Sequence, residues 1–126
     1  MPEADGWLAR AADALEEADA LLRGQFFPAS ITRSYYAMFY AARGLLSSRG
    51  ISPKSHGGTL QRFAEQFVKT GLLPAEMSSM MGAAMELREQ ADYHVDPSAL
   101  GAVKAAEVLE AARRFVDRAS AFHQSH

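Results

Sequence analysis

The sequence predicts an all-α protein, an up-and-down bundle of four long helices and one shorter helix. Apolar residues recur at three- and four-residue spacing in several segments, as on the buried face of a helix. Gly and Pro stand between these segments, and no stretch alternates clearly as a strand would. The 126 residues are expected to form one domain, 1–126, large enough to bury a core without disulfides.

The central helix is predicted at about residues 29–48, and the other helices are expected to pack around it. Ser30 is the predicted N-cap, because its side chain can accept a hydrogen bond from a first-turn N–H. One face is apolar and a second stripe is aromatic and polar, which is typical of a helix that contacts several neighbours. The apolar face contains Ile31, Tyr35, Met38, Ala42 and Leu45, and the second stripe contains Arg33, Tyr36, Tyr40 and Gly44.

Three further long helices follow from the same periodicity. The first spans about residues 3–23, with an acidic outer side, and Gly24 ends it. Another spans about 74–91 and carries four methionines, which line either the core, a dimer interface or an adaptable binding surface. The last spans about 98–122, after the breaker Asp96-Pro97. Their predicted apolar stripes are Leu8, Ala11, Leu15, Ala18 and Leu22; Leu73, Met77, Met80, Met81, Ala84, Leu87 and Ala91; and Val108, Leu109, Ala112, Phe115, Val116, Ala119 and Phe122.

The shorter helix is predicted at about residues 56–69, with Ser55 as its N-cap. Its first turn contains Gly57-Gly58, although each Gly costs around 1 kcal/mol relative to Ala inside a helix. Two explanations are open. Either the turn packs tightly against another helix, or its N–H groups bind an anion with help from Lys54 and His56.

Composition excludes several classes of protein. The chain has no Cys, so disulfides and thiolate chemistry are ruled out. It shows no basic-then-apolar leader and no apolar run near the roughly 18 residues of a membrane span, so a cytoplasmic location is expected. The net charge of −2 is unevenly distributed, with −5 over residues 1–22, +6 over 23–73 and −3 over 74–126. The basic middle part either neutralises the acidic first helix or forms a face for a polyanion.

The best candidate for a catalytic site is the sequence LREQADYH, residues 87–94, at the end of the helix predicted at about 74–91. Arg88 and Asp92 are four residues apart and can pair on one helix face. Arg88 and His94 lie about 120° apart on an ideal helix, so they converge only if the helix ends before His94 or if two copies meet. An Arg and a His suffice for metal-independent RNA cleavage, since His transfers protons and Arg stabilises charge on the phosphate. The alternative is a surface ion pair followed by a terminal His with no role.

Four segments together resemble the small stand-alone HEPN-domain proteins (higher eukaryotes and prokaryotes nucleotide-binding). They are the Tyr-rich segment 31–46, Lys54–Gly57, Phe67–Gly71 and Arg88 with Ala91–Tyr93. The resemblance implies a dimerising helical bundle, often paired with a minimal nucleotidyltransferase in a toxin–antitoxin-like module. Catalytic members carry an Arg, four to six residues and then a His, and act as ribonucleases without a metal. Arg88 and His94 fit this motif; no cofactor and no metal site are expected.

Under this resemblance Arg88 stabilises the transition state, His94 is the general acid–base, and Asp92 and Tyr93 orient them. Glu89 follows Arg88 where active members commonly have Asn, Asp or His. A non-catalytic module that binds a nucleotide or a partner therefore remains the alternative. The tyrosines of the stripe either stack on bases or pack inside the bundle. The expected RNA- or nucleotide-binding residues are Arg33, Tyr36, Tyr40, Lys54, His56 and Gly57.

Overall fold

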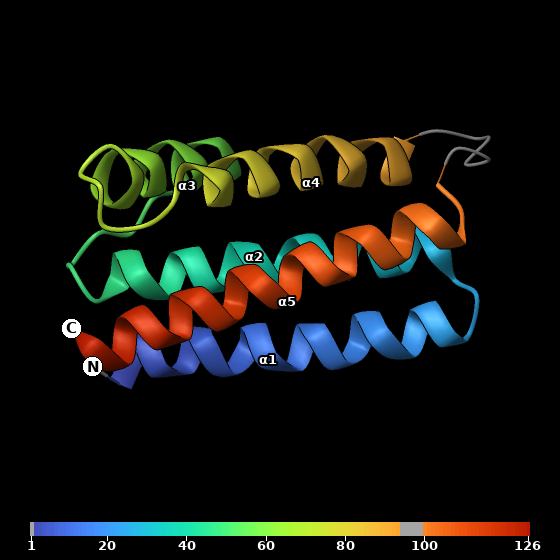
Figure 1. Cartoon of the computed structure of the whole chain (residues 1–126), viewed down its shortest axis with the longest axis horizontal. Helices are drawn as coiled ribbons and strands as arrows, with labels where there is room; N and C mark the ends of the chain where they lie inside the picture. The colour runs from blue at the N-terminus through green and yellow to red at the C-terminus, as the bar shows by residue number, and fades with distance from the viewer. Residues whose placement is uncertain (1, 94–99) are drawn as a thin grey trace.

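The computed structural model describes residues 2–93 and 100–126 and confirms the predicted fold class. The helices are α1 (Pro2–Arg23), α2 (Phe27–Ser47), α3 (His56–Phe63), α4 (Ala75–Tyr93) and α5 (Ala102–Ser125). Four long helices run alternately up and down, the short helix α3 lies between α2 and α4 in the chain, and the start of α1 lies beside the end of α5 (Figure 1). The described residues contain no strand, and none of their helices is long and apolar enough to cross a membrane.

Helix α2 is the centre of the bundle, as its two-sided pattern predicted. It packs against α1, α4 and α5, and it also touches α3. Because α2 has neighbours on most sides, its apolar face has no access to solvent, and burial of each large side chain stabilises the fold by roughly 1.5–3 kcal/mol. The predicted residues of this face, all fully buried, are Ile31, Tyr35, Met38, Ala42 and Leu45.

Helices α1 and α2 approach each other closely because small residues line their contact. The fully buried residues of α1 are all alanines, whereas the predicted Leu8 and Leu22 are only partly buried beside them. On α2, a Cβ at Gly44 would lie 3.2 Å from the Ala4 carbonyl oxygen and 3.2 Å from the Trp7 Cβ. The buried alanines are Ala4, Ala11, Ala14 and Ala18.

The start of α2 differs from the prediction. The helix begins at Phe27 rather than near residue 29, and Ser30 is not its N-cap. The Ser30 side chain instead donates a hydrogen bond to the Ala18 carbonyl oxygen of α1 at 2.8 Å. The chain turns back immediately after α1 because Gln25 adopts a positive φ of 67°, so Pro28 already falls in the first helical turn.

The predicted helix 56–69 is also not a single α-helix. Helix α3 ends at Phe63, and a π-helical turn, η1 (Ala64–Val68), follows, in which the Lys69 N–H donates to the Ala64 carbonyl oxygen. The wider turn accompanies burial of Phe63 and Phe67, whose ring centroids are 5.6 Å apart.

Helix α5 begins at Ala102 and ends at Ser125, three residues beyond the predicted end. The predicted breaker 96–97 and the predicted start at Ser98 lie outside the described residues. The predicted stripe of α5 is buried from Val108 to Ala119, while Phe122 is partly exposed.

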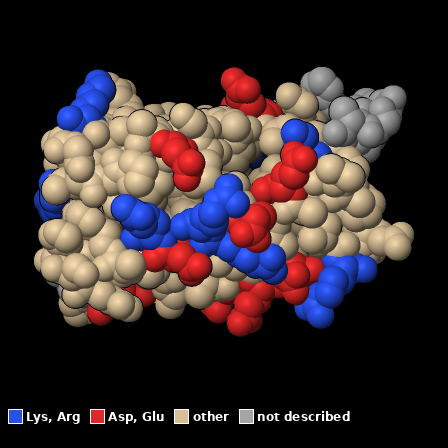
Figure 2. Space-filling model, viewed as in Figure 1, with Lys and Arg blue, Asp and Glu red and all other residues tan. Residues whose placement is uncertain are grey.

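Acidic α1 neutralises part of the basic segment. Glu17 pairs with Arg33 of α2 at 2.9 Å, and Asp19 pairs with Arg23 at 2.8 Å. Over α5 and α1, Lys and Arg side chains lie interspersed with Asp and Glu, so on this face the described residues mix both signs of charge (Figure 2). Such exposed pairs contribute little to stability, typically up to about 1 kcal/mol.

Candidate functional site

Arg88 lies near the end of α4 with only 16% of its side chain exposed. Its Nη1 donates to the Asp92 carboxylate at 3.3 Å, which confirms the pair predicted from the four-residue spacing. The guanidinium carbon lies 5.2 Å from the ring centroid of Tyr35, within the range of a cation–π contact. Its Nε is buried and has no hydrogen-bond partner among the described residues. Arg88 is therefore held in one place by Asp92 and Tyr35.

Tyr35 connects Arg88 to a histidine from a different helix. The Tyr35 hydroxyl is hydrogen-bonded to Nδ1 of His56 at 2.7 Å, and the imidazole stacks on Phe39 at 4.4 Å. Burial lowers the pKa of His56, and the nearby charges of Arg88 and Arg43 lower it further. Burial raises the pKa of Tyr35 well above its usual range, although Arg88 opposes this. Both groups are therefore neutral at pH 7.

The predicted stripe of α2 forms a continuous row of contacts. The Arg33 guanidinium lies 5.5 Å from the ring centroid of Tyr36, which is itself 5.7 Å from the Tyr40 ring. Tyr36 also meets the His56 ring edge to face at 5.7 Å. Arg33, Tyr36 and Tyr40 thus lie together, as the helical spacing predicted, and Tyr36 joins them to the Arg88, Tyr35 and His56 cluster.

A cavity of about 440 Å³ opens between α1, α2 and α4 beside this cluster. Arg33 and Thr32 of α2 line it from one side, and Asp92 lines it from α4. The cavity brings a residue predicted to bind RNA, Arg33, to the same space as a residue predicted to support catalysis, Asp92. It is large enough for part of a nucleotide.

A second network on α1 and α2 was missed by sequence reasoning. Arg10 donates to the Tyr40 hydroxyl at 3.1 Å and lies 5.2 Å from the ring centroid of Trp7. Arg43 lies 4.9 Å from the same indole and 5.9 Å from Phe39. Within the part of the chain that the structure describes, neither arginine pairs with a carboxylate. The available signal was the spacing, since Arg43 follows two aromatic residues at three and four positions along one helix.

The start of α3 is capped by a side chain. Ser55 accepts a hydrogen bond from the Gly58 N–H at 2.9 Å, which confirms its predicted role as N-cap. A Cβ at Gly58 would lie only 2.8 Å from that Ser55 oxygen, whereas Gly57 has open space around it. The contact with the cap explains why a Gly stands at position 58, whereas tight packing does not explain the Gly at position 57. The Gly58 N–H is already bound to Ser55, so it is not available to an anion. Lys54 is exposed beside this turn.

Two of the predicted catalytic residues, Tyr93 and His94, are not among the described residues that form the Arg88, Tyr35 and His56 cluster. Tyr93 is the last residue of α4 and is 78% exposed. His94 lies outside the described residues, so its meeting with Arg88 stays a prediction. Among residues 2–93 and 100–126 no group of three or more His, Asp or Glu side chains could hold a metal ion.

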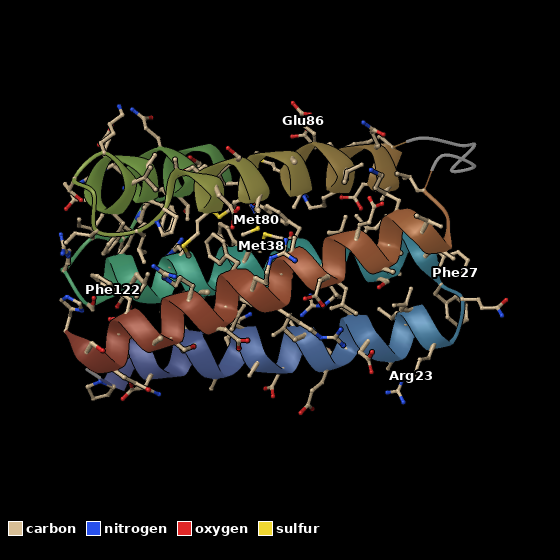
Figure 3. The ribbon with its side chains drawn as sticks, in the orientation of Figure 1. Arg23, Phe27, Met38, Met80, Glu86 and Phe122 are labelled. Carbon is tan, nitrogen blue, oxygen red and sulfur yellow. The ribbon has the colours of Figure 1, made fainter. Side chains whose placement is uncertain are left out.

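An apolar cavity of about 200 Å³ lies between α2, α4 and α5. Met38 of α2 and Met80 of α4 point toward one another beside it, while Glu86 points outward from α4 (Figure 3). Among the described residues that line it, only Lys104 and Glu107 are charged, and they pair with each other at 3.3 Å. The methionines of α4 therefore line the core and this cavity and offer no acid–base chemistry.

The comparisons with known proteins agree with the resemblance. The model of the HEPN domain matches residues 4–122. The chain belongs to the HEPN-domain family. Two similar proteins are "Putative toxin MJ0142" of Methanocaldococcus jannaschii, 35% identical over 72% of this chain, and "UPF0332 protein glr0978" of Gloeobacter violaceus, 39% identical over 73% of it. This HEPN chain covers 62% of the first relative's length, just under two thirds, and 73% of the second's.

A solved structure shares the fold of this HEPN domain. It is TT1696 from Thermus thermophilus, which superposes with a TM-score of 0.83 over 97% of this chain and 99% of that one. The two sequences are only 18% identical, so this likeness concerns the arrangement of the helices alone.

Proposed function

We propose that this HEPN protein is a toxin-type ribonuclease whose catalytic site is built around Arg88. The observation that supports this most is the position of that guanidinium. It is largely buried, it is fixed by Asp92 and by the ring of Tyr35, and Asp92 also borders the cavity lined by Arg33. A positioned Arg beside a cavity is suited to hold the charge that develops on a scissile phosphate.

In the proposed reaction the 2′-oxygen of a ribose attacks the adjacent phosphorus and the bond from phosphorus to the 5′-oxygen breaks. Arg88 stabilises the additional negative charge on the phosphate oxygens, and His94 transfers a proton. The products are a 2′,3′-cyclic phosphate and a 5′-hydroxyl. No metal or cofactor takes part in this proposal, and Asp92 and Tyr93 orient Arg88 and His94.

The aromatic row of α2 is the proposed binding surface for the RNA next to the scissile bond. Tyr36 is partly exposed and can stack on a base, while Arg33 can contact the neighbouring phosphate. Tyr40 is only 9% exposed and holds Arg10, so we assign it a supporting role. Lys54 and Gly57, at the start of α3, would contact the backbone further along.

The partners belong to the same proposal. We propose a homodimer, in which a second copy completes the site if Arg88 and His94 of one chain do not converge. The proposed antitoxin-like partner is a minimal nucleotidyltransferase. The toxin names of two relatives support a module of this kind. Light scattering coupled to gel filtration measures the dimer, and copurification with the product of a neighbouring reading frame tests the partner.

The experiment is cleavage of a single-stranded RNA by the purified protein in EDTA. We expect Arg88→Ala and His94→Ala each to lose cleavage while retaining the helical circular dichroism of the parent. Arg114→Ala and His123→Ala are the matched controls, because both lie on α5, away from the cluster, and both should cleave normally. Absence of cleavage by the parent protein would refute the ribonuclease.

The second candidate function is a non-catalytic module that binds a nucleotide. The 440 Å³ cavity beside Arg33 favours it, since the cavity could hold a nucleotide without any reaction. Saturable binding of ATP that is lost in Arg33→Gln, with no turnover of ATP or RNA, would support this function. Unchanged binding in Arg33→Gln would argue against the cavity as the site.

A further inference from the structure

His56 belongs to the Arg88 cluster although it lies outside the Arg-to-His motif and on a different helix. We propose that His56 is a second catalytic group of this site and removes the proton from the attacking 2′-hydroxyl. This inference rests on the proposed ribonuclease function. It assigns to His56 a role in the reaction itself, beyond contact with the bound RNA.

The imidazole is held on three sides. Nδ1 is hydrogen-bonded to the Tyr35 hydroxyl at 2.7 Å, one ring face stacks on Phe39 at 4.4 Å, and the edge of Tyr36 meets it at 5.7 Å. Nε2 makes no hydrogen bond to the described part of the chain, and the side chain is partly exposed. This arrangement resembles that of a catalytic base, which needs one nitrogen anchored by a third group and the other directed at the substrate.

Tyr35 contacts both His56 and Arg88. Its hydroxyl binds the imidazole, and its ring lies 5.2 Å below the Arg88 guanidinium. The Arg88 charge also acts on the imidazole, and in this proposal a phosphate bound by Arg88 brings the adjacent 2′-hydroxyl to Nε2 of His56. The proposed base, His56, and the charge-stabilising Arg88 are therefore linked through one buried side chain, that of Tyr35.

The charges around His56 favour the form that a base requires. Arg43 of α2 and Arg88 of α4 both act against a positive charge on the ring, and Tyr35 and Tyr36 contribute neutral groups. Glu89 makes a minor contribution to the raised pKa of Tyr35. Burial lowers the pKa of His56 most, and the charges of Arg88 and Arg43 lower it further, so the ring is neutral at pH 7 and can accept a proton. In this proposal Nδ1–H donates to the Tyr35 oxygen, and this bond persists after Nε2 is protonated.

RNA cleavage by this route needs two proton transfers. One proton leaves the 2′-hydroxyl as the bond from oxygen to phosphorus forms, and one reaches the 5′-oxygen as its bond to phosphorus breaks. A neutral His can accept the first proton and a protonated His can donate the second, so a single His in one protonation state carries out only one of the two transfers. With His56 as the base and His94 as the acid, both transfers have a donor or acceptor, and no further reactant is required.

The test is a pH–rate profile in EDTA with a single-stranded RNA oligonucleotide. We expect His56→Gln to lower the rate at pH 7 about a hundredfold and to remove the acidic limb of the profile. Gln is chosen because it keeps a hydrogen-bonding group near Tyr35. As a second variant, His56→Ala should recover part of its rate when imidazole is added, whereas Arg88→Ala should not.

The outcomes separate this inference from the proposed function. If the parent protein cleaves RNA and His56→Gln keeps both its rate and its acidic limb, the role of His56 is wrong and the ribonuclease stands. If the parent does not cleave, both are overturned. A His56→Ala variant that is inactive and gains nothing from imidazole shows a structural role only and also overturns the inference.

Discussion

Gly44 offers a sharp test of how closely α1 and α2 pack. Replacing Gly44 with Ala places a methyl group 3.2 Å from the Ala4 carbonyl oxygen, 3.2 Å from the Trp7 Cβ and 3.3 Å from the Leu8 Cγ. Two of these neighbours are fixed to the α1 backbone, so they cannot rotate away. The matched control is Gly82→Ala in the middle of α4, where no atom lies within 4 Å of the added methyl.

Two opposing effects set the magnitude. Ala is more favourable than Gly inside a helix by about 0.8–1.0 kcal/mol, and both variants receive this gain. Overpacking of a tight interface costs typically about 1–3 kcal/mol, and only the Gly44 variant bears this cost. We therefore expect Gly82→Ala to be about 1 kcal/mol more stable than the parent. Gly44→Ala should be about 1–3 kcal/mol less stable than Gly82→Ala.

Urea unfolding followed by circular dichroism at 222 nm measures both free energies. The slopes with urea concentration should agree among the three proteins, because the area exposed on unfolding hardly changes. Equal stabilisation by the two substitutions would show that α1 can move away from α2 at no cost. That result would refute the close helix contact and the explanation of Gly44.

Three further predictions address the α3 cap, the pH dependence and the charge pair. Ser55→Ala should destabilise the protein by about 1 kcal/mol in urea unfolding, because the Gly58 N–H loses its acceptor; no change would mean that water replaces the cap. Folding lowers the pKa of His56 from its ordinary value of 6.5, so near and just below pH 6.5 the unfolded chain binds more protons than the folded one. The free energy of unfolding should therefore fall as the pH falls from 6.5 towards the lowered pKa. His56→Gln should weaken this dependence in unfolding experiments from pH 7.5 to 5, and an identical slope would contradict the lowered pKa. A double-mutant cycle on Arg33 and Glu17 should give a coupling below about 1 kcal/mol, since both side chains are substantially exposed; a larger value would indicate an anchored pair.

The helices and their buried faces were predictable because periodicity depends only on the local sequence. Every predicted residue on the apolar face of α2 is buried, and the Arg88–Asp92 pair follows from one turn of helix. The end of α1 was equally predictable, since Gly24 directly follows it. These features need no knowledge of what lies across the interface.

The parts that failed depend on distant contacts. Ser30 was assigned to a cap by its type, but the approach of α1 brings the Ala18 carbonyl within its reach twelve residues earlier in the chain. Tyr35 was assigned to the core, which is correct, yet its hydroxyl reaches His56 across the loop that follows α2. No spacing rule predicts a pair 21 residues apart, and so the link between His56 and Arg88 emerged only from the fold.

The position of Trp7 between two arginines has a practical consequence. It is the only tryptophan of the chain, and the guanidiniums of Arg10 and Arg43 lie 5.2 Å and 4.9 Å from its ring. Indole emission responds to nearby charge, so its intensity and wavelength depend on where these two cations rest. A polyanion that draws either arginine away should alter the emission spectrum. The protein thus carries an intrinsic fluorescent reporter for occupancy of its α1–α2 face, without any attached dye.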